Sequence, residues 1–267
     1  MKPYFFRTPN RQFQFFSGIL GIFSVCLMGA VTTMDPVKKT GIAHPLNQPV
    51  VVLELFTSQG CSSCPPADAL LGNYANSSSR SIIPLSFHVD YWNRLGWSDP
   101  FSQPAFSQRQ EWYRSRIPGS SLYTPQLVID GKYERVGSNR TEIENLVQKE
   151  LAVPKQGSLR LSQVLLENDR IRFHFDAINP GEMLNVALIE KKAATSIRAG
   201  ENEGLRLLNY NVVRSFHSQT ATENGEIMLS LPGDFKADAY ALVVYTQGKF
   251  KTNIGSAVYM DLASLTK

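Results

Sequence analysis

Two cysteines separated by two serines, Cys61 and Cys64, are the residues of this 267-residue chain best suited to carry out chemistry. A third cysteine, Cys26, lies in an apolar amino-terminal segment, so the rest of the chain keeps an even number of thiols. A disulfide at this spacing closes a loop too short to remove much entropy from the unfolded chain, so a stabilising role explains it poorly. The spacing indicates either thiol–disulfide exchange or binding of a soft metal by two thiolates.

The amino-terminal segment predicts export from the cytoplasm. Lys2, Arg7 and Arg11 precede an uncharged stretch, residues 12–34, whose centre is apolar. Cations followed by such a stretch are the layout of a signal peptide, although residues 13–34 would also suffice as an uncleaved membrane anchor. On either interpretation the chain beyond residue 34 is extracytoplasmic, periplasmic or secreted, where disulfides persist. Residues 35–48, rich in turn formers, are interpreted as a linker.

Composition limits the classes of partner. The formal net charge is +4, and the three leader cations leave about +1 for the remainder. Without a basic stripe no nucleic-acid binding is expected, and the only expected membrane contact is through the amino-terminal segment. The sequence has no phosphate-binding glycine loop, no paired zinc-ligand histidines on a helix and no nucleophile elbow, so no cofactor is predicted. The expected partners are thiols and disulfides of proteins or small molecules.

Apolar runs and helical segments alternate around the cysteines. A β-branched run at 50–56 precedes them, a helical segment at 67–75 follows, and a second apolar run lies at 82–89. Further elements are expected at 105–117, 126–129, 133–136 and 142–151. The two short strands flank Asp130 and Gly131, a strong hairpin signal. Residues 49–153 are therefore predicted to form an α/β domain of order β-α-β-α-β-β-α.

The pattern changes from residue 154 onward. Segments at 158–161, 170–175 and 226–231 alternate strictly between apolar and polar residues, as half-buried antiparallel strands do. Turn residues recur between them, and further strands are expected at 184–190, 211–216, 239–246 and 254–262. Residues 154–267 are predicted to form a separate small all-β domain, a β-sandwich-like one.

The cysteine segment and a later proline resemble the thioredoxin superfamily. The resemblance rests on Cys-x-x-Cys after the first strand and on residues 123–131, which resemble a cis-proline loop with its strand and hairpin. More narrowly, residues 52–68, 87–92 and 96–101 resemble the exported bacterial domain-of-unknown-function family 1223, with further likeness at 200–204 and 211–214. That resemblance implies a thioredoxin-like fold and export, and it implies no particular reaction.

The resemblance to thioredoxins assigns roles to five residues. Cys61 would be the attacking thiolate at the amino end of a helix, and Cys64 would resolve the mixed disulfide. Thr124, before a cis Pro125, would pair its backbone with an extended substrate chain. Glu54 resembles the buried acid that accepts a thiol proton in thioredoxins, the alternative being a carboxylate that faces water at a strand edge.

Two features leave alternatives open. Pro65 and Pro66 follow Cys64 directly, so the helix is able to begin beyond the cysteine pair and leave Cys61 less acidic. His88 and Asp90 project from one strand face and suit a proton relay, or His88 could join the cysteines in a copper or zinc site. The alternative is a structural histidine beside a turn-forming aspartate. A third function is an interaction protein whose cysteine pair stays oxidised.

Overall fold

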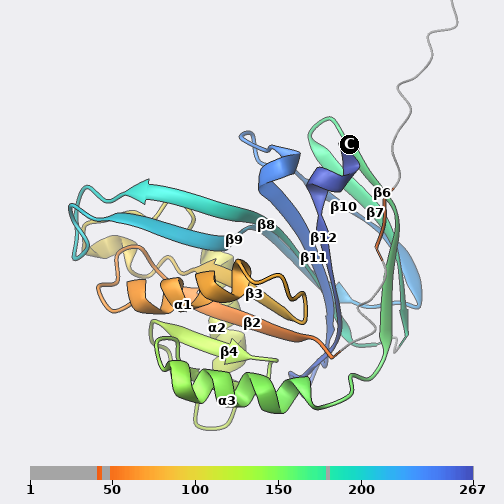
Figure 1. Ribbon diagram of the computed structural model, residues 1–267, viewed down its shortest axis with the longest axis horizontal. Coiled ribbons are helices and arrows are strands. Elements are labelled where there is room, and N and C mark those ends of the chain that lie inside the picture. Colours follow the sequence, from red (N-terminus) through yellow and green to blue (C-terminus); the bar gives the residue numbers. More distant parts are fainter. Residues whose placement is uncertain (1–40, 44–48, 179–180, 267) are drawn as a thin grey trace, which may run out of the picture. The chain divides into compact units, whose positions relative to one another are not determined.

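The computed structural model describes residues 41–43, 49–178 and 181–266 (Figure 1). The predicted signal peptide or anchor, residues 1–34, lies outside the described residues, and so does most of the predicted linker. Residues Gly41–Ala43 of that linker form a short strand, β1. None of the helices formed by the described residues is both long and apolar enough to cross a membrane.

Strands dominate the described part of the chain and form two sheets. The larger sheet has eight strands in the spatial order β12 (Ile254–Asp261), β11 (Tyr240–Gln247), β8 (Met183–Ser196), β9 (Arg206–Thr220), β3 (Ile82–His88), β2 (Val51–Thr57), β4 (Gln126–Ile129) and β5 (Tyr133–Val136). The smaller sheet has four strands in the order β1, β6 (Ser158–Glu167), β7 (Arg170–Ile178) and β10 (Asn224–Ser230). The three α-helices are α1 (Pro65–Ala75), α2 (Pro104–Arg114) and α3 (Arg140–Leu151).

The predicted fold class, an α/β thioredoxin-like domain followed by a small all-β domain, is wrong. Four of the carboxy-terminal strands do not form a sheet of their own, because β9 pairs in parallel with β3 through Val212 and Ser86. Strands β8, β9, β11 and β12 therefore continue the sheet that the cysteine-bearing segment begins, and the result is a mostly β structure with one large mixed sheet. Alternation along a strand reveals which face is buried, but it does not reveal which strand lies alongside.

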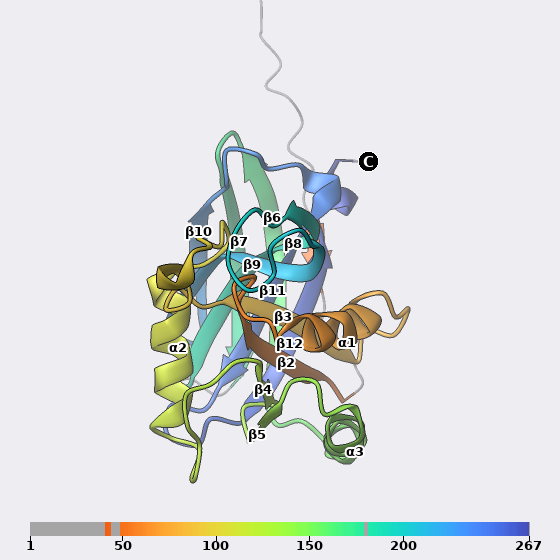
Figure 2. The same ribbon diagram turned by 90° about the vertical axis from the view of Figure 1, so that its left-hand side faces the viewer.

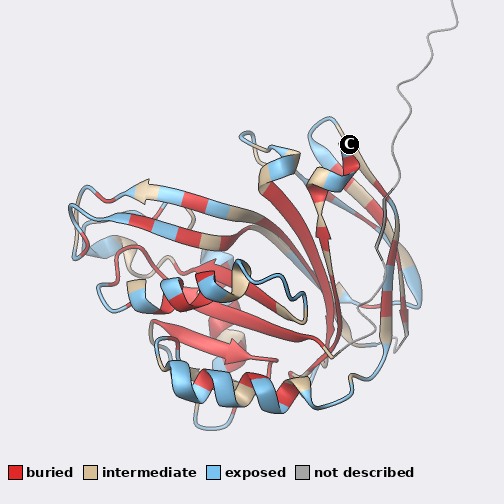
Figure 3. Ribbon diagram, viewed as in Figure 1, coloured by how far each residue is buried: buried red, intermediate tan, exposed pale blue. Residues whose placement is uncertain are grey.

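Strand β8 is buried on both of its faces, which explains why the large sheet continues into the carboxy-terminal half of the chain. In β8, Leu184, Val186 and Leu188 pack toward the four-stranded sheet, whereas Ala187 and Ile189 pack toward the core beneath α2. A strand buried on both faces reads as a continuous apolar run. The run at 186–189 is such a signal, and it indicates a strand in the interior of a larger sheet. Figure 3 shows buried residues along the length of β2, β3 and β11.

The helices cover the cysteine-bearing half of the large sheet from both sides. Figure 2 shows α2 on one side and α1 and α3 on the other. Residues of β2 alternate between these layers: Val52 and Phe56 join the core beneath α2, whereas Leu53 and Leu55 join the core beneath α1 and α3. The face of β2 on which a residue lies therefore decides whether it can approach α1.

The hairpin at residues 130–131 forms as its sequence predicts. Strands β4 and β5 pair antiparallel, and the turn residues Asp130 and Gly131 have φ values of 53° and 68°. Positive φ at both positions is the geometry of a type I′ turn, which asparagine, aspartate and glycine favour. Gly131 has a second reason to be glycine, since a Cβ there would lie 1.9 Å from the carbonyl oxygen of Thr252.

Candidate functional site

Cys61 and Cys64 form a disulfide in the segment between β2 and α1. Their Cα atoms are 5.4 Å apart, and both residues have an exposed fraction of 0%. Ser62 and Ser63, which lie between them, are exposed. The disulfide thus lies just beneath the surface, with the intervening serines on the outside and both sulfur-bearing residues covered.

The start of α1 explains how the pair relates to the helix. Helix α1 begins at Pro65, and Cys64 is its N-cap residue. The first two helical residues, Pro65 and Pro66, have no N–H, and the next two backbone N–H groups, of Ala67 and Asp68, donate to the Cys64 carbonyl. Cys61 therefore precedes the helix by one turn. The helix start offers a thiolate few of the free N–H donors that usually stabilise one.

The second predicted feature of the site, the proline loop, lies at the same end of the sheet. The Thr124–Pro125 peptide bond is cis, and the next residue, Gln126, pairs with Phe56 near the end of β2. The indole N–H of Trp92 donates to Thr124 Oγ1 at 2.7 Å, and the Trp92 side chain lies against Gly60. Trp92 thus connects the proline loop to the residue before Cys61, while the predicted pairing of Thr124 with a substrate remains a prediction.

Glu54 lies on the opposite face of the sheet from α1. Its carboxylate accepts hydrogen bonds from Arg109 Nη2 at 2.7 Å and Nε at 2.5 Å, within a fully buried cluster. The hydroxyls of Tyr113 and Tyr245 donate to the same carboxylate at 2.7 and 3.0 Å. Glu54 is thus the anion of a buried ion pair beneath α2. The structure does not bring it together with the cysteines.

Two other carboxylates and a histidine lie close to the cysteine-bearing segment, because Asp68 belongs to α1 and Asp99 accepts a hydrogen bond from the Gln59 N–H. We call Asp68, His88 and Asp99 the buried acid–histidine cluster; their exposed fractions are 5%, 0% and 3%. His88 Nδ1 lies 2.7 Å from Asp99 Oδ2, and Thr57 Oγ1 donates to Asp68 Oδ2 at 3.3 Å. Asp68 Oδ1 and His88 Nε2 are buried with no hydrogen-bond partner among the described residues. This cluster contains the only unpaired buried histidine nitrogen among those residues.

The cluster's surroundings shift its ionisation. Burial raises the pKa of Asp68 to about 7. The charge of His88 and the hydrogen bond from Thr57 lower that pKa, but burial outweighs them. Burial alone would lower the pKa of His88, but the charge and hydrogen bond of Asp99 and the charge of Asp68 outweigh it and raise that pKa. Burial likewise opposes ionisation of Asp99, yet His88 and the N–H groups of Gln59 and Phe101 hold its pKa below the usual range.

Sequence reasoning found part of this cluster and missed the rest. His88 was singled out, but its predicted neighbour Asp90 accepts a 2.5 Å hydrogen bond from the Ser107 hydroxyl instead. Asp68 is an acid in the first turn of α1, which by itself indicates only a favourable interaction with the helix dipole. Its position four residues after Cys64, on the same helical face, was the available signal. Asp99 follows a turn-rich stretch, and nothing in its spacing connects it to His88.

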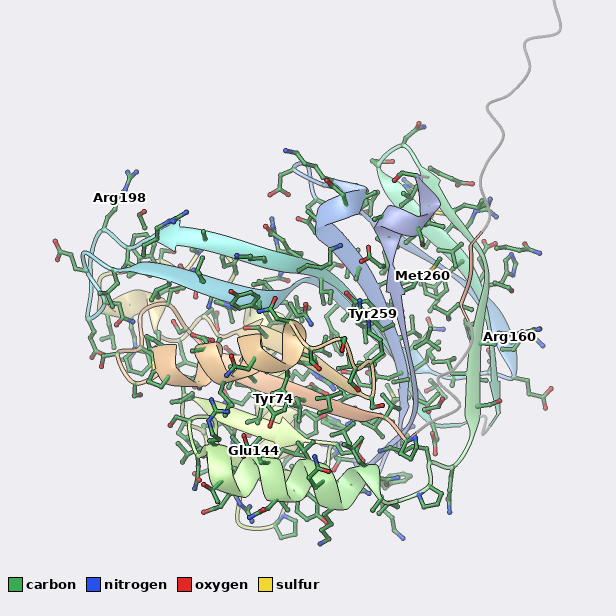
Figure 4. All side chains as sticks on the ribbon, in the orientation of Figure 1. Tyr74, Glu144, Arg160, Arg198, Tyr259 and Met260 are labelled. Atoms are coloured by element: carbon green, nitrogen blue, oxygen red, sulfur yellow. A yellow bond between two sulfur atoms is a disulfide. The ribbon has the colours of Figure 1, made fainter. Side chains whose placement is uncertain are left out.

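A loop from the carboxy-terminal half covers the disulfide. We call residues 197–205, between β8 and β9, the covering loop. The Asn202 side-chain amide donates to the carbonyl oxygens of Gln59 and Cys61, at 2.9 Å each. The Ser62 N–H donates to Glu201 Oε2 at 3.0 Å. Figure 1 shows the β8–β9 hairpin reaching over α1, and Figure 4 shows Arg198 of this loop pointing outward.

A cavity of about 350 Å³ lies between α1 and the first residues of β9. Asp68 lines it together with Pro65, the residue after Cys64, and Tyr210. The cavity is partly open to solvent, so it connects the helix face that carries Asp68 with bulk water. No group of three or more His, Cys, Asp or Glu residues among the described residues is arranged to hold a metal ion.

Comparison with known proteins supports the fold and names a family. The model of a family described as "Protein of unknown function (DUF1223)" matches residues 52–247. A crystal structure of a protein from Agrobacterium tumefaciens is similar at 24% identity and a TM-score of 0.60, covering 80% of this chain and 96% of that one. HBP35 of Porphyromonas gingivalis is similar at 15% identity and a TM-score of 0.58, covering 81% and 76%. These structures share the fold, and no curated protein matches the chain.

Proposed function

We propose that this chain, which belongs to the DUF1223 family of proteins of unknown function, carries out thiol–disulfide exchange outside the cytoplasm through Cys61 and Cys64. The observation that carries the proposal is the disulfide between residues three positions apart at the start of α1. By the chain-entropy relation a loop of this length adds only about 2 kcal/mol to stability. A disulfide that contributes so little to the fold is better explained by its chemistry.

The location outside the cytoplasm rests on two supports. Residues 1–34 have the layout of a signal peptide or anchor, and a disulfide persists in an oxidising compartment. The proposed partners are protein or small-molecule thiols and disulfides, because these are the groups with which a cysteine pair exchanges.

Exchange proceeds in two steps that balance. The Cys61 thiolate attacks one sulfur of a substrate disulfide, forms a mixed disulfide and releases the first substrate thiolate. Cys64 then loses its proton and its sulfur attacks Cys61 Sγ, which forms the bond seen here and releases the second substrate thiolate. The substrate gains two electrons, and the protein dithiol loses the same two. A thiol partner running the steps in reverse regenerates the dithiol.

Access to the disulfide requires the covering loop to move. Three hydrogen bonds hold the loop over the pair, two from Asn202 and one to Glu201. Each contributes about 1 kcal/mol net, so opening costs a few kcal/mol, a range typical of local opening in native proteins. The covered disulfide is therefore the resting state of the site, and exchange takes place in the opened state.

One observation favours a second function. Both cysteines have an exposed fraction of 0%, as expected of a pair that stays oxidised in an interaction protein. In that case the covering loop never releases the disulfide while the protein is folded. The soft-metal alternative has less support, because the two predicted thiolate ligands are joined in a disulfide and no group of three His, Cys, Asp or Glu residues in the described part of the chain is arranged to hold a metal ion.

A trapping experiment tests the proposal. The full-length Cys64→Ser variant is reduced, mixed with oxidised glutathione and analysed by peptide mass spectrometry, which separates Cys61 from Cys26. Exchange predicts a stable Cys61–glutathione adduct, because the resolving thiol is missing. Cys61→Ser is the matched control and should form its adduct on Cys64 far more slowly. Failure of the folded Cys64→Ser variant to form any adduct on Cys61 would exclude exchange and leave the oxidised interaction protein.

A further inference from the structure

Exchange through the pair requires a group to take up a proton near Cys64. The resolving thiol must ionise before it attacks, and a thiol in apolar surroundings resists ionisation. Helix starts usually ease this step with free N–H groups, but α1 begins with two prolines and its next N–H groups already donate to the Cys64 carbonyl. The helix start therefore gives the Cys64 thiolate little help, and a neighbouring base has to supply it.

Asp68 is the carboxylate in the right place. It lies one helical turn after Cys64, and its backbone N–H donates to the Cys64 carbonyl at 3.1 Å. One carboxylate oxygen accepts a hydrogen bond from Thr57, whereas the other, Oδ1, is buried and unpaired. A buried carboxylate oxygen with no partner is costly, so it needs an explanation. Oδ1 therefore keeps a lone pair available to accept a proton.

His88 supplies the neighbouring charge. Asp99 fixes its Nδ1, and Asp99 is itself held by the backbone N–H groups of Gln59 and Phe101. The other ring nitrogen, Nε2, is buried and unpaired, like Asp68 Oδ1. The groups that act on Asp68 are Thr57 at the end of β2, His88 at the end of β3, Asp99 in the following loop and Asn209 of β9.

The cluster also has a path to solvent. Asp68 lines the cavity of about 350 Å³ between α1 and β9, and that cavity is partly open. A proton taken from Cys64 can therefore leave through water in the cavity without passing the covering loop. A proton acceptor also has to lie within reach of the proton that it takes, and the position of Asp68 one helical turn after Cys64 places its side chain on the helix face of that residue.

We propose that Asp68 accepts the proton of Cys64 when Cys64 attacks the mixed disulfide, and that His88, held by Asp99, positions and charges the site for this transfer. The proposal rests on the exchange function proposed above. In the forward step the Cys64 S–H bond breaks, the proton passes to an Asp68 oxygen, and the new thiolate attacks Cys61 Sγ as the substrate thiolate leaves. In the reverse step protonated Asp68 returns the proton to Cys64 as its sulfur leaves Cys61.

The test follows the resolving step directly. Reduced full-length protein is mixed with excess oxidised glutathione and quenched with acid at intervals, and the Cys61–glutathione intermediate is quantified by mass. Its decay reports the attack by Cys64. Asp68→Asn is expected to slow this decay by about 10²-fold at neutral pH, the lower end of general-base catalysis. Asp90→Asn is the matched control, since Asp90 bonds to Ser107 and takes no part in the cluster.

The pH profile separates proton transfer from a structural effect. In the unsubstituted protein the decay rate should rise through an inflection near pH 7, where Asp68 loses its proton. Asp68→Asn should lose that inflection, and Asp90→Asn should keep it. His88→Gln should shift the inflection upward, because the positive charge that favours the Asp68 carboxylate is gone.

Three outcomes decide the matter. An Asp68→Asn protein with an unchanged decay rate and pH profile overturns the role of Asp68 and leaves exchange intact. An unsubstituted dithiol that oxidised glutathione does not convert to the Cys61–Cys64 disulfide, together with a Cys64→Ser variant that forms no Cys61 adduct, overturns exchange itself. If Asp68→Asn does not fold, infrared difference spectra of the unsubstituted protein between its dithiol and disulfide states replace it. The proposal requires a buried carboxylic-acid band to change at neutral pH, and an unchanged band contradicts it.

Discussion

Replacing Asn202 by alanine should make the disulfide easier to reach. The Asn202 amide donates two hydrogen bonds of 2.9 Å, to the carbonyl oxygens of Gln59 and Cys61, and no other side chain of the covering loop contacts Cys61 in this way. In the open state water satisfies both carbonyls in either protein. At about 1 kcal/mol per hydrogen bond, the free energy that favours the closed loop over the open loop falls by ~2 kcal/mol in the variant. The population of the open state then rises about 30-fold.

The assay is the rate at which a small dithiol reduces the Cys61–Cys64 bond. Samples of full-length protein are quenched with an alkylating reagent, and labelled Cys61 and Cys64 are counted by peptide mass spectrometry. When the loop closes faster than the reductant reacts, the rate follows the opening equilibrium. The predicted result is therefore a rate about 30 times that of the unsubstituted protein. Asn224→Ala, in β10 of the other sheet, is the matched control and should not change the rate.

A reduction rate for Asn202→Ala within about twofold of the unsubstituted protein, with an unchanged urea midpoint, would refute the reasoning. It would mean that the reductant reaches the sulfurs without displacing the covering loop. A variant that reacts faster only because its urea midpoint falls sharply would also count against it, since global unfolding then exposes the pair.

Three further predictions concern stability, each measured by urea unfolding. Arg109→Met leaves the Glu54 carboxylate buried without its cation and should cost about 3–5 kcal/mol, most of it recovered when Glu54→Leu is added; a loss below about 1 kcal/mol contradicts the buried ion pair. Burial raises the pKa of Asp68 from 3.8 to about 7, so between these values the folded protein holds a proton that the unfolded chain has released. Stability should then fall as pH rises through this window, and Asp68→Asn should remove that fall; an identical pH dependence in the variant is the contrary result. Replacing Cys61 and Cys64 together by serine should cost no more than about 2 kcal/mol, and a loss twice as large would indicate a structural disulfide.

Local elements of the fold follow from the sequence, whereas the partners of the strands do not. The apolar run at 50–56 corresponds to β2, and the helical segment at 67–75 lies within α1. The pairing of β3 with β9 joins segments more than a hundred residues apart and depends on side chains that no local pattern connects. Treating the carboxy-terminal strands as a separate sandwich was wrong for that reason.

The candidate site divides in the same way. The cysteine pair is evident from its spacing, because both residues lie in one short segment. Glu54 was assigned to the site by resemblance, but strand alternation places it with Val52 and Phe56 beneath α2, away from α1. Asp68, four residues after Cys64, lies on the same face of the helix as Cys64 and is in the position that was expected of Glu54. Asn202 and Asp99 reach the site through folded loops, and sequence spacing gives no means of finding them.

A redox titration tests the central claim most directly. Folded full-length protein is equilibrated with glutathione buffers of increasing thiol content, and the fraction of Cys61–Cys64 disulfide is measured by alkylation and mass spectrometry while far-UV circular dichroism follows the fold. Exchange predicts a reversible two-electron transition in the folded protein, reached from either the dithiol or the disulfide. A disulfide that stays oxidised in every buffer until the protein unfolds would contradict the account.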